Sequence, residues 1–323
     1  MSNEIVQKNK ALVWEYWNKF NESQANEKLN IVRSNIHENI SWHGVYPFND
    51  LTGVDALISE FWQPLLHAIP DLKRTTEIFI GGHRHWVGAI GYFSGTFTHD
   101  WLGIPATGRE INIRFGEFSA VHDGKIGLTY IIPDLLDVIR QAGYQVVPPS
   151  LGKEGQITGP LTGDGVLLTP HDDAEGAKTL ALAKTMCAEL NTPRCEQYWD
   201  SEAMIWYGPS GIGTTRGYKE FEDFHQDPFL EIFPKFGCEY AGLHVVEVGE
   251  GNYAGWVGWP SIRAIQVREY LGCPPTGKKI DWRLMDFYRR EGDLIMENWV
   301  PIDMIYIFLQ MGFDVFKELK KQI

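Results

Sequence analysis

One segment of this chain occurs twice, and the repeat limits what the chain can fold into. Residues 104–143 and 273–312 each contain a Pro-x-Thr-Gly-Arg/Lys turn, an acidic residue followed by Phe, and a second turn at Asp-Gly or Glu-Gly. In both copies two extended stretches precede an Asp, Asp134 or Asp303, and the apolar spacing after it becomes helical. Asp is a favoured helix N-cap, and the Gly that closes each copy favours a helix end. Each copy therefore predicts strand, turn, strand and short helix.

The segments that precede the repeat also recur. Trp206-Tyr207-Gly208 follows Trp42-His43-Gly44 at an offset of 164 positions, and a Gly…Pro…Pro pattern recurs at that same offset. Beyond Gly103 and Gly272 the offset becomes 169. A period this long indicates a duplicated domain rather than a solenoid.

The repeat and the local composition together predict the domain organisation. A stretch rich in Gly and Pro, without a sustained period, is typical of a linker. We therefore expect a first domain at 1–147, a linker at 148–170 and a second domain at 171–323. Helices followed by a bent antiparallel sheet and a last short helix indicate an α+β domain.

Secondary structure in the first domain follows from periodicity and from glycine and proline. A proline inside a helix removes a donor, so the third helix is expected to be kinked or restarted at Pro64. The predicted helices are 3–20, 26–36, 53–70 and 134–142, and the predicted strands are 39–43, 72–82, 85–100, 109–122 and 125–132.

Composition excludes several classes of partner. The formal net charge of −13 disfavours nucleic acid and anionic membranes, which need basic patches. Residues 1–20 are charged and helical, unlike a signal peptide, and no apolar run is long enough to span a bilayer. The cysteines are far apart, so we expect them to be reduced and mostly buried in a cytoplasmic protein. They are Cys187, Cys195, Cys238 and Cys273.

These motifs resemble the SnoaL-like polyketide cyclases, which have the cone-shaped α+β fold of nuclear transport factor 2. The resemblance rests on the Trp-His-Gly and Trp-Tyr-Gly triplets, the Gly…Pro…Pro helix, the turns at 102–109 and 271–278, and Glu-Asn-Trp at 297–299. The whole chain is similar to the two-domain bacterial proteins called predicted ester cyclases. The resemblance implies two tandem, cystatin-like cones, each a curved antiparallel sheet wrapped around helices. The cones would pack as an internal pseudo-dimer, open to further homodimerisation.

The resemblance also assigns positions within each cone. The acid/base Asp of the antibiotic-pathway cyclases aligns with Ile131 and Val300, and their assisting His aligns with Glu117 and Asp286. Each of these two carboxylates stands alone in an apolar strand. If that strand face lines the cone, desolvation raises the carboxylate pKa and creates a general base. The alternative is a carboxylate that forms an ion pair with a neighbouring Arg.

His43 and Tyr207 occupy one position in the two halves, and either could hydrogen-bond a substrate oxygen. With Glu117 and Asp286 they complete the predicted catalytic set. His225 replaces Phe61 in the repeated helix, which could mark the second cavity. The predicted substrate-binding residues are Trp42, Trp206, His99, His225, Arg268 and Trp299.

Other chemistries lack a sequence signal. His83 and His85 could share a strand face, but no third ligand is placed, and we expect no metal and no cofactor. No nucleophile elbow, phosphate loop or nicotinamide fingerprint is present. We therefore expect cofactor-free acid/base chemistry on a small carbonyl or ester compound, as in a cyclase, isomerase or hydratase. The alternatives are a non-catalytic small-molecule binding protein and an assembly module of the same fold.

Overall fold

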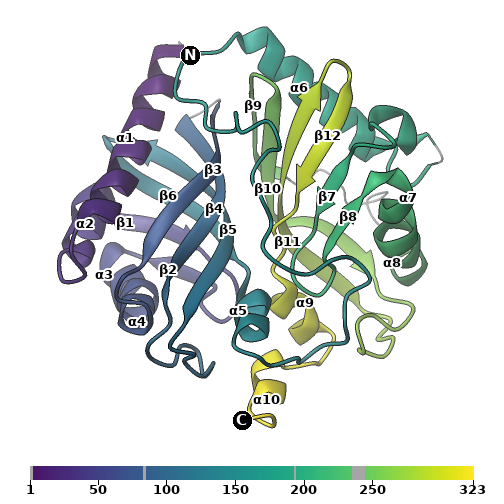
Figure 1. Ribbon diagram of the computed structural model, residues 1–323. Helices are drawn as coiled ribbons and strands as arrows, with labels where there is room; N and C mark the ends of the chain where they lie inside the picture. The colour runs from purple at the N-terminus through teal and green to yellow at the C-terminus, as the bar shows by residue number, and fades with distance from the viewer. Residues whose placement is uncertain (1–2, 83–84, 193, 235–243) are drawn as a thin grey trace.

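The computed structural model describes residues 3–82, 85–192, 194–234 and 244–323, and it contains two similar halves (Figure 1). The elements of the first half are α1 (Asn3–Glu22), α2 (Lys28–Asn35), β1 (Ile36–His43), β2 (Asp50–Thr52), α3 (Val54–Leu57), η1 (Ile58–Trp62), α4 (Gln63–Ala68), β3 (Lys73–Gly81), β4 (Trp86–Thr96), β5 (Glu110–His122), β6 (Lys125–Pro133) and α5 (Leu135–Gln141).

The second half repeats this order after the connecting segment. Its elements are α6 (Asp173–Ala188), η3 (Cys195–Tyr198), β7 (Ile205–Tyr207), β8 (Thr214–Arg216), α7 (Gly217–Phe221), η4 (Glu222–Gln226), α8 (Asp227–Ile232), β9 (His244–Glu250), β10 (Tyr253–Ile265), β11 (Lys279–Glu291), β12 (Leu294–Trp299), α9 (Met304–Gln310) and α10 (Val315–Leu319).

Each half contains one six-stranded sheet, and the two sheets have equivalent strand orders. The first runs β2-β1-β6-β5-β4-β3 and the second β8-β7-β12-β11-β10-β9. The duplicated α+β architecture predicted from the sequence is therefore confirmed. One detail differs, because β1 pairs with β6, and β7 with β12, in parallel. Each sheet is mixed rather than purely antiparallel, since the first strand enters beside the last one and points the same way.

The proline-containing helix of each half runs on through its proline. A π-helical segment, Ile58–Trp62, lies just before Pro64, and Glu222–Gln226 lies just before Pro228. The wider π turn lets Gln63 N–H donate to Ile58 O while the proline at the next position has no N–H to place. The sequence predicted a kink or restart here; the structure instead contains a π-bulge in an uninterrupted helix.

The Asp residues of the repeat cap their helices as predicted. Asp134 accepts from Asp137 N at 3.1 Å, and Asp303 accepts from Tyr306 N at 3.1 Å. The second carboxylate oxygen of each residue reaches into the other half. Asp134 Oδ2 accepts from Ser210 N at 2.9 Å, and Asp303 Oδ2 accepts from Tyr46 N at 3.1 Å. The contacts are reciprocal, as expected for two domains related by a pseudo-twofold axis.

Aromatic contacts support the same pseudo-twofold relation. Phe118 and Phe287 occupy equivalent positions in β5 and β11, and their rings stack with centroids 4.9 Å apart. Each neighbours the inward-facing carboxylate of its strand, Glu117 or Asp286, so it points to the opposite face of the sheet. The outer faces of the two sheets thus meet, and the two halves form an internal pseudo-dimer (Figure 1).

The segment expected to be a linker runs over both halves as an ordered strap. Tyr92 Oη donates to Ile157 O and accepts from Ile157 N, both at 2.8 Å. Trp299 Nε1 donates to Thr158 O at 3.1 Å, and Leu167 N donates to Phe79 O at 3.0 Å. The strap therefore contacts the first sheet and the second. The domain boundaries placed on either side of it stay a prediction.

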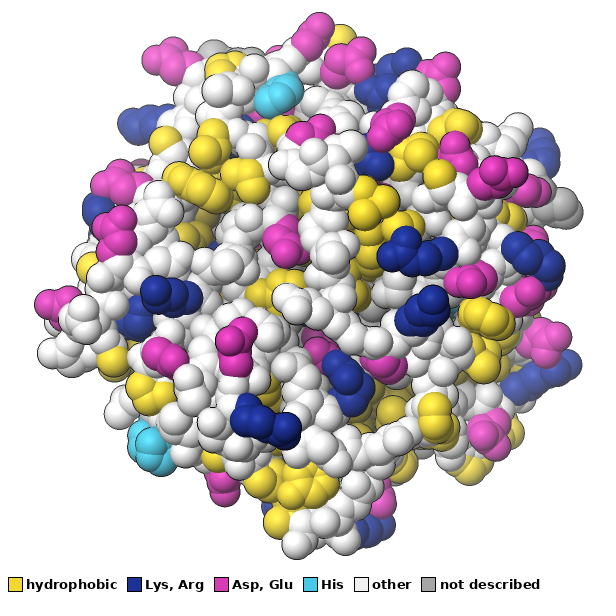
Figure 2. Space-filling view, in the orientation of Figure 1, with side chains coloured by type: hydrophobic (Ala, Val, Ile, Leu, Met, Phe, Trp, Pro, Cys, Tyr) yellow, Lys and Arg dark blue, Asp and Glu magenta, His cyan; other side chains and the backbone are white. Residues whose placement is uncertain are grey.

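The surface in the view of Figure 2 carries acidic and basic side chains interspersed, without one basic patch on that face. In the part of the chain that the structure describes, no helix is both long and apolar enough to cross a membrane.

Candidate functional site

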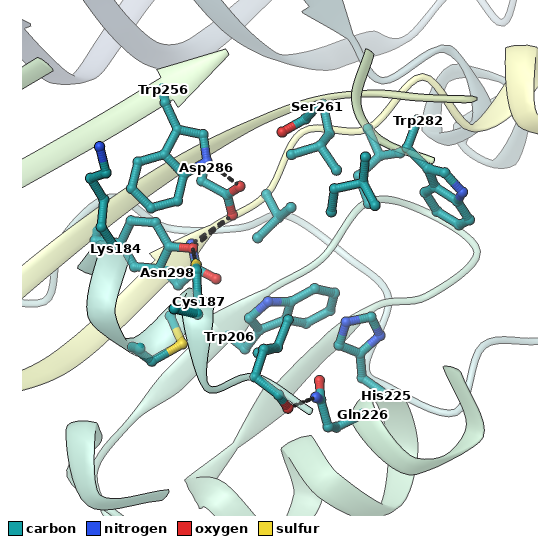
Figure 3. A pocket seen from close by; sticks show the side chains of 18 of the residues that line it. Lys184, Cys187, Trp206, His225, Gln226, Trp256, Ser261, Trp282, Asp286 and Asn298 are labelled. Carbon is teal, nitrogen blue, oxygen red and sulfur yellow. Dashed lines mark hydrogen bonds between the residues drawn. The ribbon is translucent and has the colours of Figure 1, made fainter. Parts of the chain in front are cut away.

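A mainly apolar hollow with convergent polar groups lies in the second half (Figure 3). It has a volume of about 290 Å³, near the lower end for small-molecule sites. Its walls come from α6, the helix α7-η4-α8 and the concave face of β10–β12. The side chains used below are Lys184, Cys187, Trp206, His225, Gln226, His244, Glu247, Trp256, Ile262, Trp282, Asp286, Tyr288, Asn298 and Val300.

Asp286 presents its carboxylate to this cavity from the middle of β11. Trp256 Nε1 donates to Oδ2 at 2.8 Å, and Tyr288 Oη donates to Oδ1 at 3.1 Å. Asn298 Nδ2 lies 3.4 Å from Oδ1 and also donates to Phe287 O at 3.1 Å. The donors come from three adjacent strands, β10, β11 and β12, so the curvature of the sheet fixes the carboxylate (Figure 3).

The electrostatic setting of Asp286 favours proton uptake. Burial raises its pKa. The hydrogen bond from Asn298, the nearby His244 and the hydrogen bonds from Tyr288 and Trp256 oppose that rise only in part. Burial also raises the pKa of Tyr288 well above its ordinary value, so this hydroxyl stays protonated and donates. Among the described residues, no Lys or Arg forms an ion pair with Asp286. The carboxylate of Asp286 is therefore hydrogen-bonded by neutral donors.

His225 lies on another wall of the cavity (Figure 3). Its ring stacks on Trp206 with centroids 4.0 Å apart, and it also contacts Phe221 and Phe229. Burial lowers the pKa of His225 to about 3, so the imidazole is neutral at physiological pH. A neutral imidazole beside a cavity can donate from one nitrogen and accept at the other.

The remaining charged groups around the cavity neutralise one another. Lys184 Nζ lies 2.6 Å from Glu247 Oε2, and His244 Nδ1 lies 2.9 Å from Glu247 Oε1. The His244 ring stacks on Trp256, whose indole N–H donates to Asp286. Asp286 thus forms no ion pair with a described Lys or Arg, although the nearby His244 opposes the rise that burial causes in its pKa.

The matched carboxylate of the first half has a different environment. Glu117 is buried, and its Oε2 lies 2.8 Å from Arg74 Nη1. Ser119 Oγ donates to the other oxygen at 3.1 Å. The Arg74 guanidinium lies over the rings of Trp17 and Phe115, 4.0 and 4.2 Å from their centroids. The first cone is therefore filled by an ion pair and aromatic rings. Its Arg comes from β3, not from the neighbours considered in the sequence.

Residue size accounts for the hollow in one cone and its absence from the other. Trp62 in the first helix corresponds to Gln226, whose Nε2 donates to Leu190 O at 2.6 Å. Phe93 pairs with Ile113 across β4 and β5, as Ile262 pairs with Trp282 across β10 and β11, so Phe93 corresponds to Ile262. The replacement of Trp62 by Gln226 removes ring volume from the second cone, whereas the Phe93–Ile113 and Ile262–Trp282 pairs each contain one ring.

His43 and Tyr207, which were predicted to act together with Glu117 and Asp286, do not lie beside these carboxylates. Tyr207 Oη donates to Glu297 at 2.9 Å, and its ring stacks on Trp299, 5.0 Å away. His43 Nδ1 lies 2.7 Å from Asp50 Oδ1, and its ring stacks on Tyr130. Both belong to the outer face of their sheets because the preceding Trp points inward and strand side chains alternate. Neither residue shares a cavity with the matched carboxylate.

The predicted binding residues divide in the same way. Trp206 and His225 line the cavity, and Trp42 packs on Phe61 in the filled first cone. Gly44 and Gly208 are required because a Cβ at either would collide with the Trp two residues earlier. Three other predicted residues lie outside the cavity. They are exposed His99, which stacks on His67; exposed Arg268, which pairs with Glu231; and buried Trp299, which contacts the strap.

Several cavity residues were not predicted from the sequence. Tyr288 could have been found, because it stands two positions after Asp286 on the same strand face. Trp256 pairs with Asp286 across β10 and β11, and this register becomes known only once the sheet is formed. Asn298 belongs to the Glu-Asn-Trp motif, but alternation points it into the cone and Trp299 out of it.

The remaining titratable residues add no second centre. Cys187 lies beside the cavity with Sγ 3.5 Å from Tyr288 Oη, while Cys195 and Cys273 are buried free thiols. Cys238 and His83 lie outside the described residues. Within the described ranges, no three His, Cys, Asp or Glu side chains form a group suited to a metal ion.

Comparison with known proteins supports the resemblance drawn from the motifs. Residues 15–142 match the family model described as SnoaL-like polyketide cyclase. This match confirms the similarity to that family in the first half of the chain. The second half repeats the same strand order. A search among curated proteins gives no match.

Solved structures similar to the chain cover about one of its halves. A candidate SnoaL-like polyketide cyclase from Jannaschia sp. CCS1 is 17% identical, covers 44% of this chain and 95% of its own, and has a TM-score of 0.39. IdmH, a candidate polyketide cyclase from Streptomyces antibioticus, is 20% identical, covers 42% and 99%, and has a TM-score of 0.36. An NTF2-like protein of unknown function from Burkholderia pseudomallei K96243 is 18% identical, covers 45% and 100%, and has a TM-score of 0.34.

Proposed function

We propose that the second domain binds a small, largely apolar carbonyl or ester compound and that Asp286 transfers a proton to or from it. The observation that supports this proposal best is a carboxylate without an ion pair among the described residues, presented to an aromatic cavity of about 290 Å³. The reaction class is cofactor-free enolisation, cyclisation, isomerisation or hydration, in keeping with the cyclase family that the first half matches.

In this proposal Asp286 is the base. Its raised pKa brings the proton affinity of the Asp286 carboxylate closer to that of the carbanion that forms beside a carbonyl. Trp256, Tyr288 and Asn298 orient the carboxylate through donors on three strands. His225 is suited to hydrogen-bond the substrate oxygen, because its imidazole is neutral and faces the cavity. The aromatic walls exclude water and strengthen both interactions.

The first domain serves as the structural partner in this proposal. Glu117 is held by Arg74, and removing a proton from substrate would require that ion pair to open. Catalytic roles for Glu117, His43 and Tyr207 stay predictions from the sequence.

One observation favours a binding protein as the second candidate. Val300, at the position of the cyclase acid/base Asp, makes this part of the cavity wall apolar. A cavity that only binds would tolerate an apolar residue there.

Hydrogen–deuterium exchange separates the two candidates. The protein is incubated in D₂O with a panel of aryl ketones, including phenylacetone, and loss of the proton α to the carbonyl is followed by NMR. General-base catalysis contributes about 10²–10⁴-fold, so Asp286→Asn should slow exchange by at least about 100-fold. Asp281→Asn, the same substitution on the same strand outside the cavity, should leave exchange unchanged. Equal exchange by wild type and Asp286→Asn would show that Asp286 is not the base.

A further inference from the structure

Several buried carboxylates of this protein form an ion pair with a buried cation. Glu117 pairs with Arg74 at 2.8 Å, Glu250 with Lys10 and Glu297 with Arg289, each at 2.5 Å. Desolvation of a carboxylate is costly, and a nearby cation offsets it. Asp286 has no such cation among the described residues, yet it faces a cavity large enough for a molecule.

The first cone shows what occupies the equivalent space when it is filled. At Glu117, the position that matches Asp286, the partner is a guanidinium placed between two aromatic rings. A carboxylate together with ring faces is a favourable environment for an organic cation. Arg74 thus acts as a cationic group supplied by the chain itself.

The second cone keeps this environment, and among the described residues no Lys or Arg forms an ion pair with Asp286. Trp256 and Tyr288 stand beside Asp286, with ring centroids 4.9 Å apart, and Trp206 and Trp282 contribute further walls.

The charges around the cavity also favour a cation. Lys184 and His244 are both engaged by Glu247, and His225 is neutral. Asp286 is left without an ion pair to a described Lys or Arg, in a protein whose formal net charge is −13. An anionic ligand would be placed against that carboxylate without a described cation to receive it.

We infer that the second-domain cavity takes an organic cation, a guanidinium or an ammonium group carried on an apolar or aromatic body, with the cation on Asp286 and the body against the tryptophans. This inference rests on the proposed function, since it names the substrate class of the same site. The bound cation keeps Asp286 ionised, and it has to move off the carboxylate before Asp286 accepts a proton, as Arg74 would at Glu117. Binding is accordingly coupled to release of any proton that Asp286 holds in the empty cavity.

Benzylguanidinium and benzylurea test this inference, because they share a shape and differ in charge. Both are titrated into the full-length protein by calorimetry, in two buffers with different ionisation enthalpies. We expect wild type to bind benzylguanidinium at least about tenfold more tightly than benzylurea, which corresponds to one charge-assisted contact. Asp286→Asn should remove that preference, and Asp281→Asn should retain it. Thermal unfolding of each variant verifies that it is folded.

Three results would overturn the inference: equal or tighter binding of benzylurea, no saturable binding of benzylguanidinium to wild type, or a preference that survives in Asp286→Asn. A preference that survives in Asp286→Asn would mean that the cation binds elsewhere on the acidic surface. Ketone exchange that depends on Asp286, without cation preference, would reject the cation and retain the proposed chemistry. Cation binding that depends on Asp286, without exchange of any ketone, would retain the cation and leave a binding protein.

Discussion

The two cones of this protein share a fold and differ in what fills them. In the first, Arg74 and Glu117 form a buried ion pair among aromatic rings. In the second, Asp286 has only neutral donors and faces a cavity of about 290 Å³. The comparison teaches that a duplicated domain can close one cavity and keep the other while both sheets retain the same strand order.

The largest expected effect comes from breaking the pair that fills the first cone. Arg74→Met leaves Glu117 charged, buried and without its cation, so the free energy of unfolding should fall by about 3–5 kcal/mol. Urea denaturation at neutral pH measures the loss. Arg263→Met is the control, since its half-exposed pair with Asp281 should contribute less than about 1 kcal/mol. Equal losses in the two variants would mean that the buried pair does not hold the first cone together.

A smaller effect tests the contacts that join the two halves. Burial raises the pKa of Asp303 from its ordinary value of 3.8 to about 6. The folded state therefore binds this proton more tightly than the unfolded state. The contribution is fully present below pH 3.8 and is lost as pH rises to about 6, a loss of about 3 kcal/mol. Asp303→Asn should remove this pH dependence.

The free energy of unfolding of wild type and of Asp303→Asn is measured by urea denaturation at several pH values from about 3.5 to about 7. Asp314→Asn is the control for loss of capping, because Asp314 accepts from Lys317 N within its own helix. Parallel curves for wild type and Asp303→Asn would show that Asp303 does not titrate in this range.

The smallest expected change in stability comes from making the second cone resemble the first. Ile262→Phe introduces the ring that Phe93 provides in the first half. Because the ring enters an existing hollow, the free energy of unfolding should change by less than about 1.5 kcal/mol. Binding of benzylguanidinium, followed by calorimetry, should be lost. Unaltered binding in a folded Ile262→Phe protein would mean that the probe binds outside this cavity.

Much of the fold was predictable because its signals are local. The expected strands 109–122 and 125–132 correspond to β5 and β6, and the caps Asp134 and Asp303 lie where they were predicted. Strand alternation also placed Glu117 and Asp286 on inward faces. The helix at Pro64 was less predictable, because a π turn requires neighbours that stabilise a continuous helix.

The candidate site was predictable only in part. Asp286 and Trp206 were found because they repeat positions of the first half, and His225 was found because it departs from that repeat. Tyr207 was predicted to act with Asp286 because of its place in the repeat. Strand alternation instead places Tyr207 on the outer face of the sheet. Trp256 and Asn298 depend on strand register, which the tertiary fold sets.

The sequence by itself determined the duplication, the order of elements in each half and the two helix caps, since all of these follow from spacing along the chain. Only the tertiary structure decided which cone is open, because the volume of a cone depends on side chains from several elements that meet at one place. The reach of Arg74 from β3 to Glu117 closes the first cone. The smaller side chain of Gln226, where the first helix has Trp62, contributes to the hollow of the second one.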